Sequence, residues 1–352
     1  MLAWDGSIGR QKCCDIGLVS PAYSVFEFDK GIDLNWVEYL LKTPRAVQKY
    51  RVASRGTNVR RKKLPFEDFA ALEFPVPPIL EQQKIAEILG SIDGAIAATR
   101  RVIEQTRNLK RALMQDLLTR GIPARHIRFK DSALGPVPTQ WQVRRAIDLC
   151  SRISVGIVVE PSKHYRNEGI SCLRPLNVGE NEIKHTDMIF ISEESNHLHR
   201  KSQLREGDVL IVRSGYPGTA CVVTPEFAGA NCVDVVIASP KRDIIDSRYL
   251  CQFINSDVGR GHVLDKQVGG AQQHFNVGHM KVMDVAVPTL QEQIQILAII
   301  ELIDRRLTLE QQMLAALEQQ AKATSAALLS GEIRVPVVTL RELAHERSMS
   351  GG

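Results

Sequence analysis

The stretch "PPILEQQKIAEILGSID" (residues 77–93) recurs as "PTLQEQIQILAIIELID" (residues 288–304), and this repeat decides the fold. The two Glu-Gln pairs begin at Glu81 and Glu292, 211 residues apart. From each pair onward, apolar residues follow at alternating steps of four and three, which is the spacing of a heptad seam. The repeat therefore predicts two long amphipathic helices.

The predicted helix ends match as well. Pro77 and Pro78 favour a helix start, and Thr289 to Glu292 reads as a capping box. Gly121 and Gly331 stand where C-terminal caps belong. Each helix would run for about 40 residues, or roughly 60 Å.

Helices of this length with a half-apolar stripe need a partner, and each copy offers the other one. The alternative is two unrelated amphipathic helices on separate domains. The matched spacing and the matched ends favour pairing. The predicted seam consists of Ile85, Leu89, Ile92, Ile96, Ile103, Leu113 and Leu117 in the first copy, and of Ile296, Ile300, Ile303, Leu307, Leu314, Leu317 and Leu328 in the second.

Composition places the chain in a broad class. Its 352 residues suit two or three domains, and 44% apolar content fits a globular protein. It has neither a run of eighteen apolar residues nor a signal-peptide pattern, so a cytoplasmic protein without membrane contact is expected. The net charge of +5 permits a polyanionic partner without requiring one.

Residues 136–287 read as an α/β domain. Their β-branched runs are separated by Gly and Pro turns, as in "GDVLIVRSGYPGTACVV" (207–223) and "NCVDVVIASP" (231–240). A short helix, "SRYLCQFINS" (247–256), and a Gly-rich loop, "KQVGGAQQHFN" (266–276), follow.

The N-terminal segment repeats only the end of that plan. "AWDGSIGRQKC" (3–13) resembles "VRSGYPGTACV" (212–222), and "LNWVEYLLKTP" (34–44) resembles "SRYLCQFINSD" (247–257). In this register about seventy residues of the second copy have no counterpart before Met1. The first domain therefore looks like half a domain: either the true start lies upstream of Met1, or the gene is truncated or recombined.

These stretches together resemble the specificity (S) subunit of type I restriction–modification systems, the HsdS family. The resemblance rests on "FPVPPILEQQKIAEILGSID", "LGPVPTQW", "LRPLNV", "GDVLIVRSGYPG" and the paired "P-x-L-x-EQ" helices, in this order, and it covers nearly the whole chain. It implies an α+β fold, in which α/β target-recognition domains, one partial and one complete, are separated by two long conserved helices that form an antiparallel coiled-coil spacer.

The resemblance also implies a division of the chain and a function. In that family each recognition domain reads one half of a split DNA sequence, and the helices fix the distance between the half-sites. The expected parts are the C-terminal half of a first target-recognition domain (1–76), a first spacer helix (77–122), a linker with a second target-recognition domain (123–287), a second spacer helix (288–333) and a C-terminal tail (334–352).

The same resemblance implies the partners. They are double-stranded DNA, two methyltransferase (M) subunits and, in the full complex, two restriction (R) subunits. S-adenosylmethionine, ATP and magnesium are expected on those subunits, and no cofactor or metal on this chain. The chain itself has no GxxxxGK[ST] or GxGxxG motif and no Asn-Pro-Pro-aromatic motif, so it is expected to be non-catalytic.

The candidate DNA contacts are cations, which bind phosphates, and forked polar groups, which read base edges. The alternative for each is a solvated polar loop. They are Arg60, Arg61, Lys62 and Lys63 before the first helix, Arg174 and Asn177 in "LRPLNV", Arg213, Ser214 and Tyr216 on a glycine-flanked turn, and Lys266, Gln267, Gln272, Gln273 and His274 in the Gly-rich loop.

Two further interpretations stay open. His197 and His199 could be metal ligands, but no other Cys/His cluster lies nearby in sequence, which favours an exposed loop pair.

The truncation leaves a second function possible, a defective or regulatory fragment that binds partners through its coiled coil, reads at most one half-site and could self-associate. A self-contained nuclease or methyltransferase is disfavoured by the missing motifs.

The basic run 60–63 generates a prediction. Neutralising these four side chains should flatten the dependence of log affinity for DNA on log salt concentration, because fewer counterions are released on binding. A binding titration at several salt concentrations measures the slope, and an unchanged slope would remove these residues from the interface.

Overall fold

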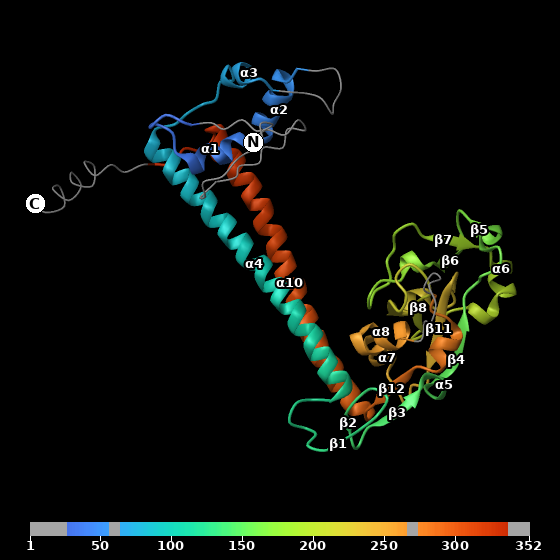
Figure 1. The fold of residues 1–352 in the computed structure, drawn as a ribbon. Helices are drawn as coiled ribbons and strands as arrows, with labels where there is room; N and C mark the ends of the chain where they lie inside the picture. Colours follow the sequence, from blue (N-terminus) through green and yellow to red (C-terminus); the bar gives the residue numbers. More distant parts are fainter. Residues whose placement is uncertain (1–26, 56–63, 266–273, 337–352) are drawn as a thin grey trace, which may run out of the picture. The chain divides into compact units, whose positions relative to one another are not determined.

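The structure is a computed structural model that describes residues 27–55, 64–265 and 274–336 (Figure 1). The chain divides into two compact units. The first unit comprises Met1–Ile103 and Leu309–Gly352, and the second comprises Glu104–Thr308. Both boundaries fall inside the two long helices, so each helix contributes one end to each unit.

The long helices are α4 (Ile79–Thr119) and α10 (Leu290–Ser330), each of 41 residues. The Pro78 carbonyl accepts hydrogen bonds from the first turn of α4, and the Thr289 hydroxyl accepts one from the Glu292 amide at 3.3 Å. Gly121 and Gly331 follow the helix ends with φ of +81° and +77°, the left-handed conformation of a helix C-cap. The two predicted long helices and their glycine C-caps are confirmed.

The two helices run antiparallel (Figure 1). In the first unit Ile85 and Leu89 of α4 share an apolar cluster with Leu328 of α10, and Arg100 forms an ion pair with Glu318 at 2.6 Å. In the second unit the opposite ends meet, because Leu117 of α4 lies in one cluster with residues from the start of α10. Lys110 pairs there with Asp304 at 2.7 Å.

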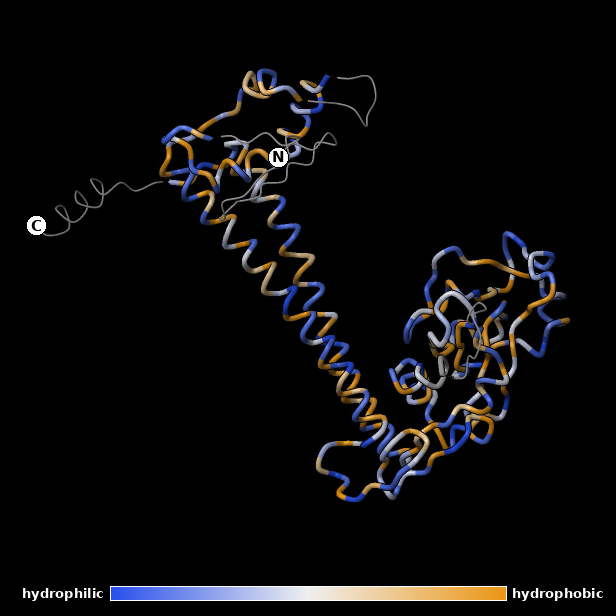
Figure 2. Tube along the Cα trace, in the orientation of Figure 1, coloured by the Kyte–Doolittle hydropathy of each residue, from blue (hydrophilic) through white to orange (hydrophobic). Residues whose placement is uncertain are grey.

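Apolar positions recur along both helices (Figure 2). All fourteen residues of the predicted seam are buried or half-buried in the structure. Most of the buried ones lie toward the helix ends, where short helices and strands cover them. Ile103, in the middle of α4, is also buried, at 4% exposure, and the other central ones keep partial exposure. The ends of the seam therefore belong to the cores of the two units.

The second unit is built on two four-stranded sheets. The first has the order β4-β11-β8-β9 and is antiparallel throughout; the second has the order β10-β6-β7-β5, with β10 and β6 parallel. Strand bounds are β4 (Cys150–Val155), β5 (Tyr165–Arg166), β6 (Ile170–Leu173), β7 (Ile189–Ile191), β8 (Val209–Val212), β9 (Ala220–Val222), β10 (Asn231–Cys232) and β11 (Val235–Pro240).

Shorter elements complete the second unit. Two-stranded sheets pair β1 (Phe129–Lys130) with β2 (Val137–Pro138) and β3 (Gln142–Arg145) with β12 (Asp284–Val287). The short helices are α5 (Ala146–Leu149), α6 (Glu193–Leu198), α7 (Ser247–Asn255), α8 (Asp257–Asp265) and α9 (Val277–Lys281), and the 3-10 helices are η2 (Pro161–His164), η3 (Pro175–Asn177), η4 (Arg200–Ser202) and η5 (Pro225–Phe227).

The first unit repeats part of this plan with α1 (Leu34–Leu41), α2 (Pro44–Ala53) and α3 (Phe66–Ala70). Asp33 caps α1 as Asp246 caps α7. Three residues after these caps, Trp36 and Tyr249 are 1% and 0% exposed. Because the caps and the buried aromatic side chains coincide, α1 and α7 are equivalent elements.

The glutamine of each Glu-Gln pair forms hydrogen bonds that connect the start of a long helix to the N-cap of a short helix, α1 or α7. Gln82 is fully buried; its amide oxygen accepts from the Asp33 amide at 2.8 Å, and its nitrogen donates to the carbonyls of Gly31 and Pro77. Gln293 makes the same three bonds in the second unit, to the Asp246 amide and to the carbonyls of Ile244 and Pro288.

The glutamate of each pair binds the chain that leaves the antiparallel helix. In the first unit Arg334 donates two hydrogen bonds to the Glu81 carboxylate, at 2.7 and 2.6 Å. In the second unit the Glu292 carboxylate accepts from Trp141 at 3.1 Å and contacts His126 at 2.7 Å. Only one half of the expected capping box is therefore present. The Thr289 hydroxyl accepts from the Glu292 amide, but the Glu292 carboxylate binds residues that follow the end of α4.

Within the described part of the chain, no helix is both long and apolar enough to cross a membrane.

We expect Gln82→Ala and Gln293→Ala each to lower the free energy of unfolding by about 1–3 kcal/mol, since a buried amide and two carbonyls lose their partner. Urea unfolding measures the change. The neighbouring Gln83→Ala and Gln291→Ala, at exposed positions, serve as controls that should remain near wild type. Equal stability of all four proteins would contradict a structural role for the buried pair.

The Glu81 ion pair predicts a dependence of stability on pH. Hydrogen bonds from Arg334 hold the pKa of the Glu81 carboxyl below its ordinary value of 4.5. A lowered pKa in the folded state contributes stability above the ordinary pKa, and this contribution is lost as the pH falls through the lowered value.

Glu81→Gln should therefore reduce the loss of unfolding free energy that wild type shows on acidification below pH 4.5. Urea unfolding at a series of pH values measures the slope. Glu87→Gln removes a carboxylate that is 69% exposed on the same helix and should keep the wild-type slope. The same slope in all three proteins would show that the Glu81–Arg334 ion pair does not contribute to the pH dependence of the unfolding free energy.

Candidate nucleic-acid interface

Four loops meet at one end of the β4-β11-β8-β9 sheet, three of them brought together by antiparallel pairing. Val155 at the end of β4 pairs with Val236, and Val212 at the end of β8 pairs with Val235 at the start of β11. The segments 156–160, 213–219 and 233–234 therefore leave the sheet side by side. The Phe275 amide donates to the Arg213 carbonyl at 2.8 Å and adds the segment 274–278. We call these four segments the loop edge.

An ion pair organises the loop edge. Arg213 Nη1 lies 2.6 Å from Asp234 Oδ1, and the Ser214 hydroxyl donates to Asp234 Oδ2 at 3.3 Å. Asp234 has φ of +53°, a left-handed conformation that aspartate tolerates better than most residues. Arg213 Nε is buried without a hydrogen-bond partner. The guanidinium is thus held at the edge with part of its donor capacity unused.

Tyr216 is the most exposed large hydrophobic side chain of the loop edge. It is 85% exposed at the turn between β8 and β9, between Gly215 and Gly218, which both have φ of +86°. Glycine adopts this conformation without strain, so the turn can project an aromatic ring into solvent. Such a ring beside a fixed cation can stack on bases or contact a sugar-phosphate backbone.

A cavity of about 260 Å³ opens at the same edge. Its lining combines the Arg213 side chain with valines that could accept an apolar group such as a thymine methyl. Val158 and Val159, in the first loop of the edge, are 49% and 73% exposed. The lining residues are Val155, Val158, Arg213, Asn276, Val277 and Gly278.

Two residues predicted to contact DNA, Arg174 and Asn177, make hydrogen bonds within the second unit. Asn177 is fully buried, and its amide nitrogen donates to the carbonyls of Lys184 and Thr186 at 3.0 and 2.8 Å. Arg174 donates a hydrogen bond to the Asp187 carbonyl and closes the same loop. The expectation for Asn177 is therefore wrong, because a side chain with no exposed surface cannot reach a base.

The remaining predicted contacts divide between described and undescribed residues. Arg213, Ser214 and Tyr216 lie together on the loop edge, and His274 is exposed at the start of its fourth segment. Arg60, Arg61, Lys62, Lys63, Lys266, Gln267, Gln272 and Gln273 lie outside the described residues. Sequence reasoning missed Asp234; a lone aspartate between two strand-like runs, in "CVDVV", was the available signal.

The expected pair of exposed loop histidines is also wrong. His197 is exposed in α6, whereas His199 is half-buried at the end of that helix. The partner of His199 is His164, whose Nε2 lies 3.1 Å from His199 Nε2.

The described cysteines are buried thiols. Burial raises the pKa of the Cys150, Cys172 and Cys221 thiols to about 12, so all three stay protonated at neutral pH. A protonated, buried thiol is a poor nucleophile.

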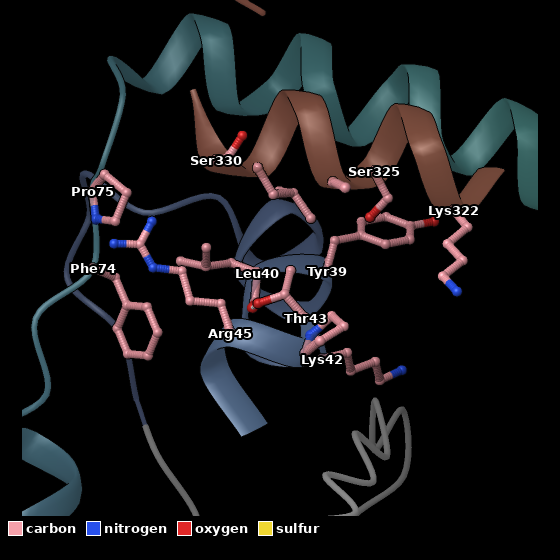
Figure 3. A pocket seen from close by; sticks show the side chains of 13 residues that line it. Tyr39, Leu40, Lys42, Thr43, Arg45, Phe74, Pro75, Lys322, Ser325 and Ser330 are labelled. Carbon is pink, nitrogen blue, oxygen red and sulfur yellow. Dashed lines mark hydrogen bonds between the residues drawn. The ribbon is translucent and has the colours of Figure 1, made fainter. Parts of the chain in front are cut away.

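The first unit contains a separate, largely apolar pocket of about 410 Å³ (Figure 3). Leu40, Phe74 and Leu329 contribute apolar surface, and Lys42, Arg45 and Lys322 are the charged residues of the lining. The equivalent face of α7 in the second unit is covered by β9, where the Asn255 side chain bonds both backbone groups of Ala220. The pocket thus marks a helix face that is covered by a strand in the second unit.

Comparison with known proteins identifies the family of this architecture. Residues 2–106 and 138–319 match the family model described as the type I restriction modification DNA specificity domain. The specificity subunit of the type I restriction enzyme MjaVIII from Methanocaldococcus jannaschii is 24% identical over 95% of this chain and 79% of its own length.

Two further matches agree. The specificity subunit of the type I restriction enzyme EcoBI from Escherichia coli is 23% identical over 79% of this chain and 65% of its own length. The crystal structure of the HsdS subunit from Thermoanaerobacter tengcongensis has the same fold, with a TM-score of 0.50 and 17% identity over 86% of this chain and 71% of that chain.

The burial of Asn177 yields a prediction. Asn177→Ala should lower the free energy of unfolding by about 1–3 kcal/mol, because the carbonyls of Lys184 and Thr186 lose their donor and the Arg174 amide loses its acceptor. Thermal or urea unfolding measures this change. Asn167→Ala, at an exposed position in the same unit, is the matched control. A variant of wild-type stability would return Asn177 to the candidate contacts.

Proposed function

We propose that this chain, which belongs to the type I restriction–modification DNA specificity family, is a DNA sequence-recognition subunit that binds a bipartite double-stranded target. The observation that carries the proposal is the loop edge of the second unit, where Arg213, fixed by Asp234, lies in the same turn as the exposed Tyr216. An oriented guanidinium and a projecting aromatic ring are groups that contact base edges and backbone.

The loop edge would act by presenting preorganised groups to a DNA groove. Asp234 holds one nitrogen of the Arg213 guanidinium, so this side chain loses little conformational freedom when it binds. Ser214, bonded to the same carboxylate, keeps its hydroxyl beside the guanidinium. The valines of the cavity supply apolar contact surface.

The spacer helices and the partners extend this proposal. We expect α4 and α10 to separate the two reading sites and to present docking surface to methyltransferase subunits, with restriction subunits joining the full complex. S-adenosylmethionine, ATP and magnesium would then act on those subunits. The chain itself would be non-catalytic, in line with the relatives, which are named as specificity subunits.

A second candidate function is a coiled-coil scaffold that reads at most one half-site. It is favoured by the junctions at the two Glu-Gln pairs, which join the long helices to each other in both units. The described loop edge lies in the second unit.

Methylome sequencing of cells that carry this chain with its methyltransferase partner tests the proposal. We expect a split methylated motif, and Tyr216→Ala should reduce methylation by weakening one half-site. Ile127→Ala, which removes an apolar side chain that is 89% exposed outside the loop edge, is the control.

Each other outcome has a distinct meaning. A motif with one defined half would favour the scaffold function. No methylated motif, with stable chain and partner present, would contradict sequence recognition. A split motif whose methylation is unchanged in the Tyr216→Ala protein would move the reading site away from the loop edge.

A further inference from the structure

His164 and His199 bring two ring nitrogens to one point in the second unit. Their Nε2 atoms are 3.1 Å apart, and the ring planes are nearly perpendicular, at 83°. His164 ends η2 directly before β5, and His199 follows α6, which itself follows β7. Pairing of β5 with β7, Tyr165 opposite Ile191, brings together histidines that are 35 residues apart in sequence.

The separation of the two nitrogens suits a metal ion. In a tetrahedral zinc site the zinc–nitrogen bonds are about 2.0–2.1 Å, which places two ligand nitrogens roughly 3.3 Å apart. The observed 3.1 Å needs an opening of only a few tenths of an ångström. A single hydrogen bond between the rings also fits this distance, so the two states differ in whether a proton or a metal ion joins the nitrogens.

The other nitrogen of His164 is already engaged in the way that metal ligands require. Its Nδ1 lies 3.2 Å from the Ser195 hydroxyl, which can accept a hydrogen bond from Nδ1–H. Ser195 is held in turn by Ser192, the N-cap of α6. The Ser195 backbone amide donates to the Ser192 hydroxyl, and the Ser192 hydroxyl donates to the Ser195 hydroxyl, both at 3.1 Å. Ligating histidines typically donate their second ring N–H to such a partner, which leaves Nε2 free to bind the ion.

We propose that His164 and His199 form a binding site for a divalent transition-metal ion such as Zn²⁺, with water completing the coordination shell. Within residues 27–55, 64–265 and 274–336 no group of three or more His, Cys, Asp or Glu side chains is arranged to hold a metal. The site is therefore an open one with two protein ligands.

Metal binding would tie η2 to the end of α6. η2 directly follows the segment 156–160, the first segment of the loop edge. The ion would thus restrain one end of that segment. Metal binding is independent of the proposed DNA recognition, since it needs only the folded second unit.

Isothermal titration of the tag-free chain with Zn²⁺ tests the site. Wild type and His197→Gln should bind one Zn²⁺ with equal affinity at this site, because His197 is an exposed residue of α6 outside the pair. His164→Gln and His199→Gln should each weaken binding by more than about 10-fold, and Ser195→Ala by about 10–100-fold. Equal affinity in all five proteins would overturn the proposal.

A second measurement needs no variant. Diethyl pyrocarbonate modifies accessible imidazoles, and mass spectrometry of the wild-type chain locates the modified histidines. Zn²⁺ should protect His164 and His199 and leave His197 and His185, which are exposed, as reactive as before. Unchanged modification of His164 and His199 at saturating Zn²⁺ would show that the pair is held by a hydrogen bond alone.

Discussion

The fold depends on two buried glutamine side chains at the starts of the long helices. Gln82 and Gln293 each satisfy one amide and two carbonyls where a short helix, an extended segment and a long helix meet. A glutamine amide carries both donors and an acceptor, so one side chain can close such a junction, and a charged or apolar side chain cannot. Each junction fixes where the short capped helix lies against its long helix.

The adjacent glutamates give the pair its second function. Glu81 and Glu292 bind the chain beyond the C-terminal end of the opposite helix, through Arg334 in one unit and through His126 and Trp141 in the other. Each Glu-Gln pair therefore joins the start of one long helix to the end of the other. The repeated Glu-Gln pair thus connects the two long helices in each unit, with different partner residues.

The loop edge illustrates how the same scaffold positions functional groups. Strands β8 and β11 are almost entirely buried, β4 mixes apolar and polar residues, and the antiparallel pairing of the three carries no information about bases. The pairing places three loops side by side at one end of the sheet. Arg213, which follows β8, can therefore form an ion pair with Asp234, which precedes β11. Loops of this kind can change in sequence without disturbing the buried strands, since their side chains lie mostly outside the core.

The sequence by itself determined the long helices, their caps, the heptad seam and the strand-rich second unit, because periodicity and capping are local properties that a single chain segment carries. It also indicated the glycine-flanked turn at Tyr216. It could not assign Asn177, whose polar side chain suits either a base or a buried loop, and it paired His199 with its sequence neighbour instead of His164. Only the tertiary structure decided those roles, along with the partners of Glu292 and Arg213, because burial and pairing across 20 or more residues depend on how strands and helices register against one another.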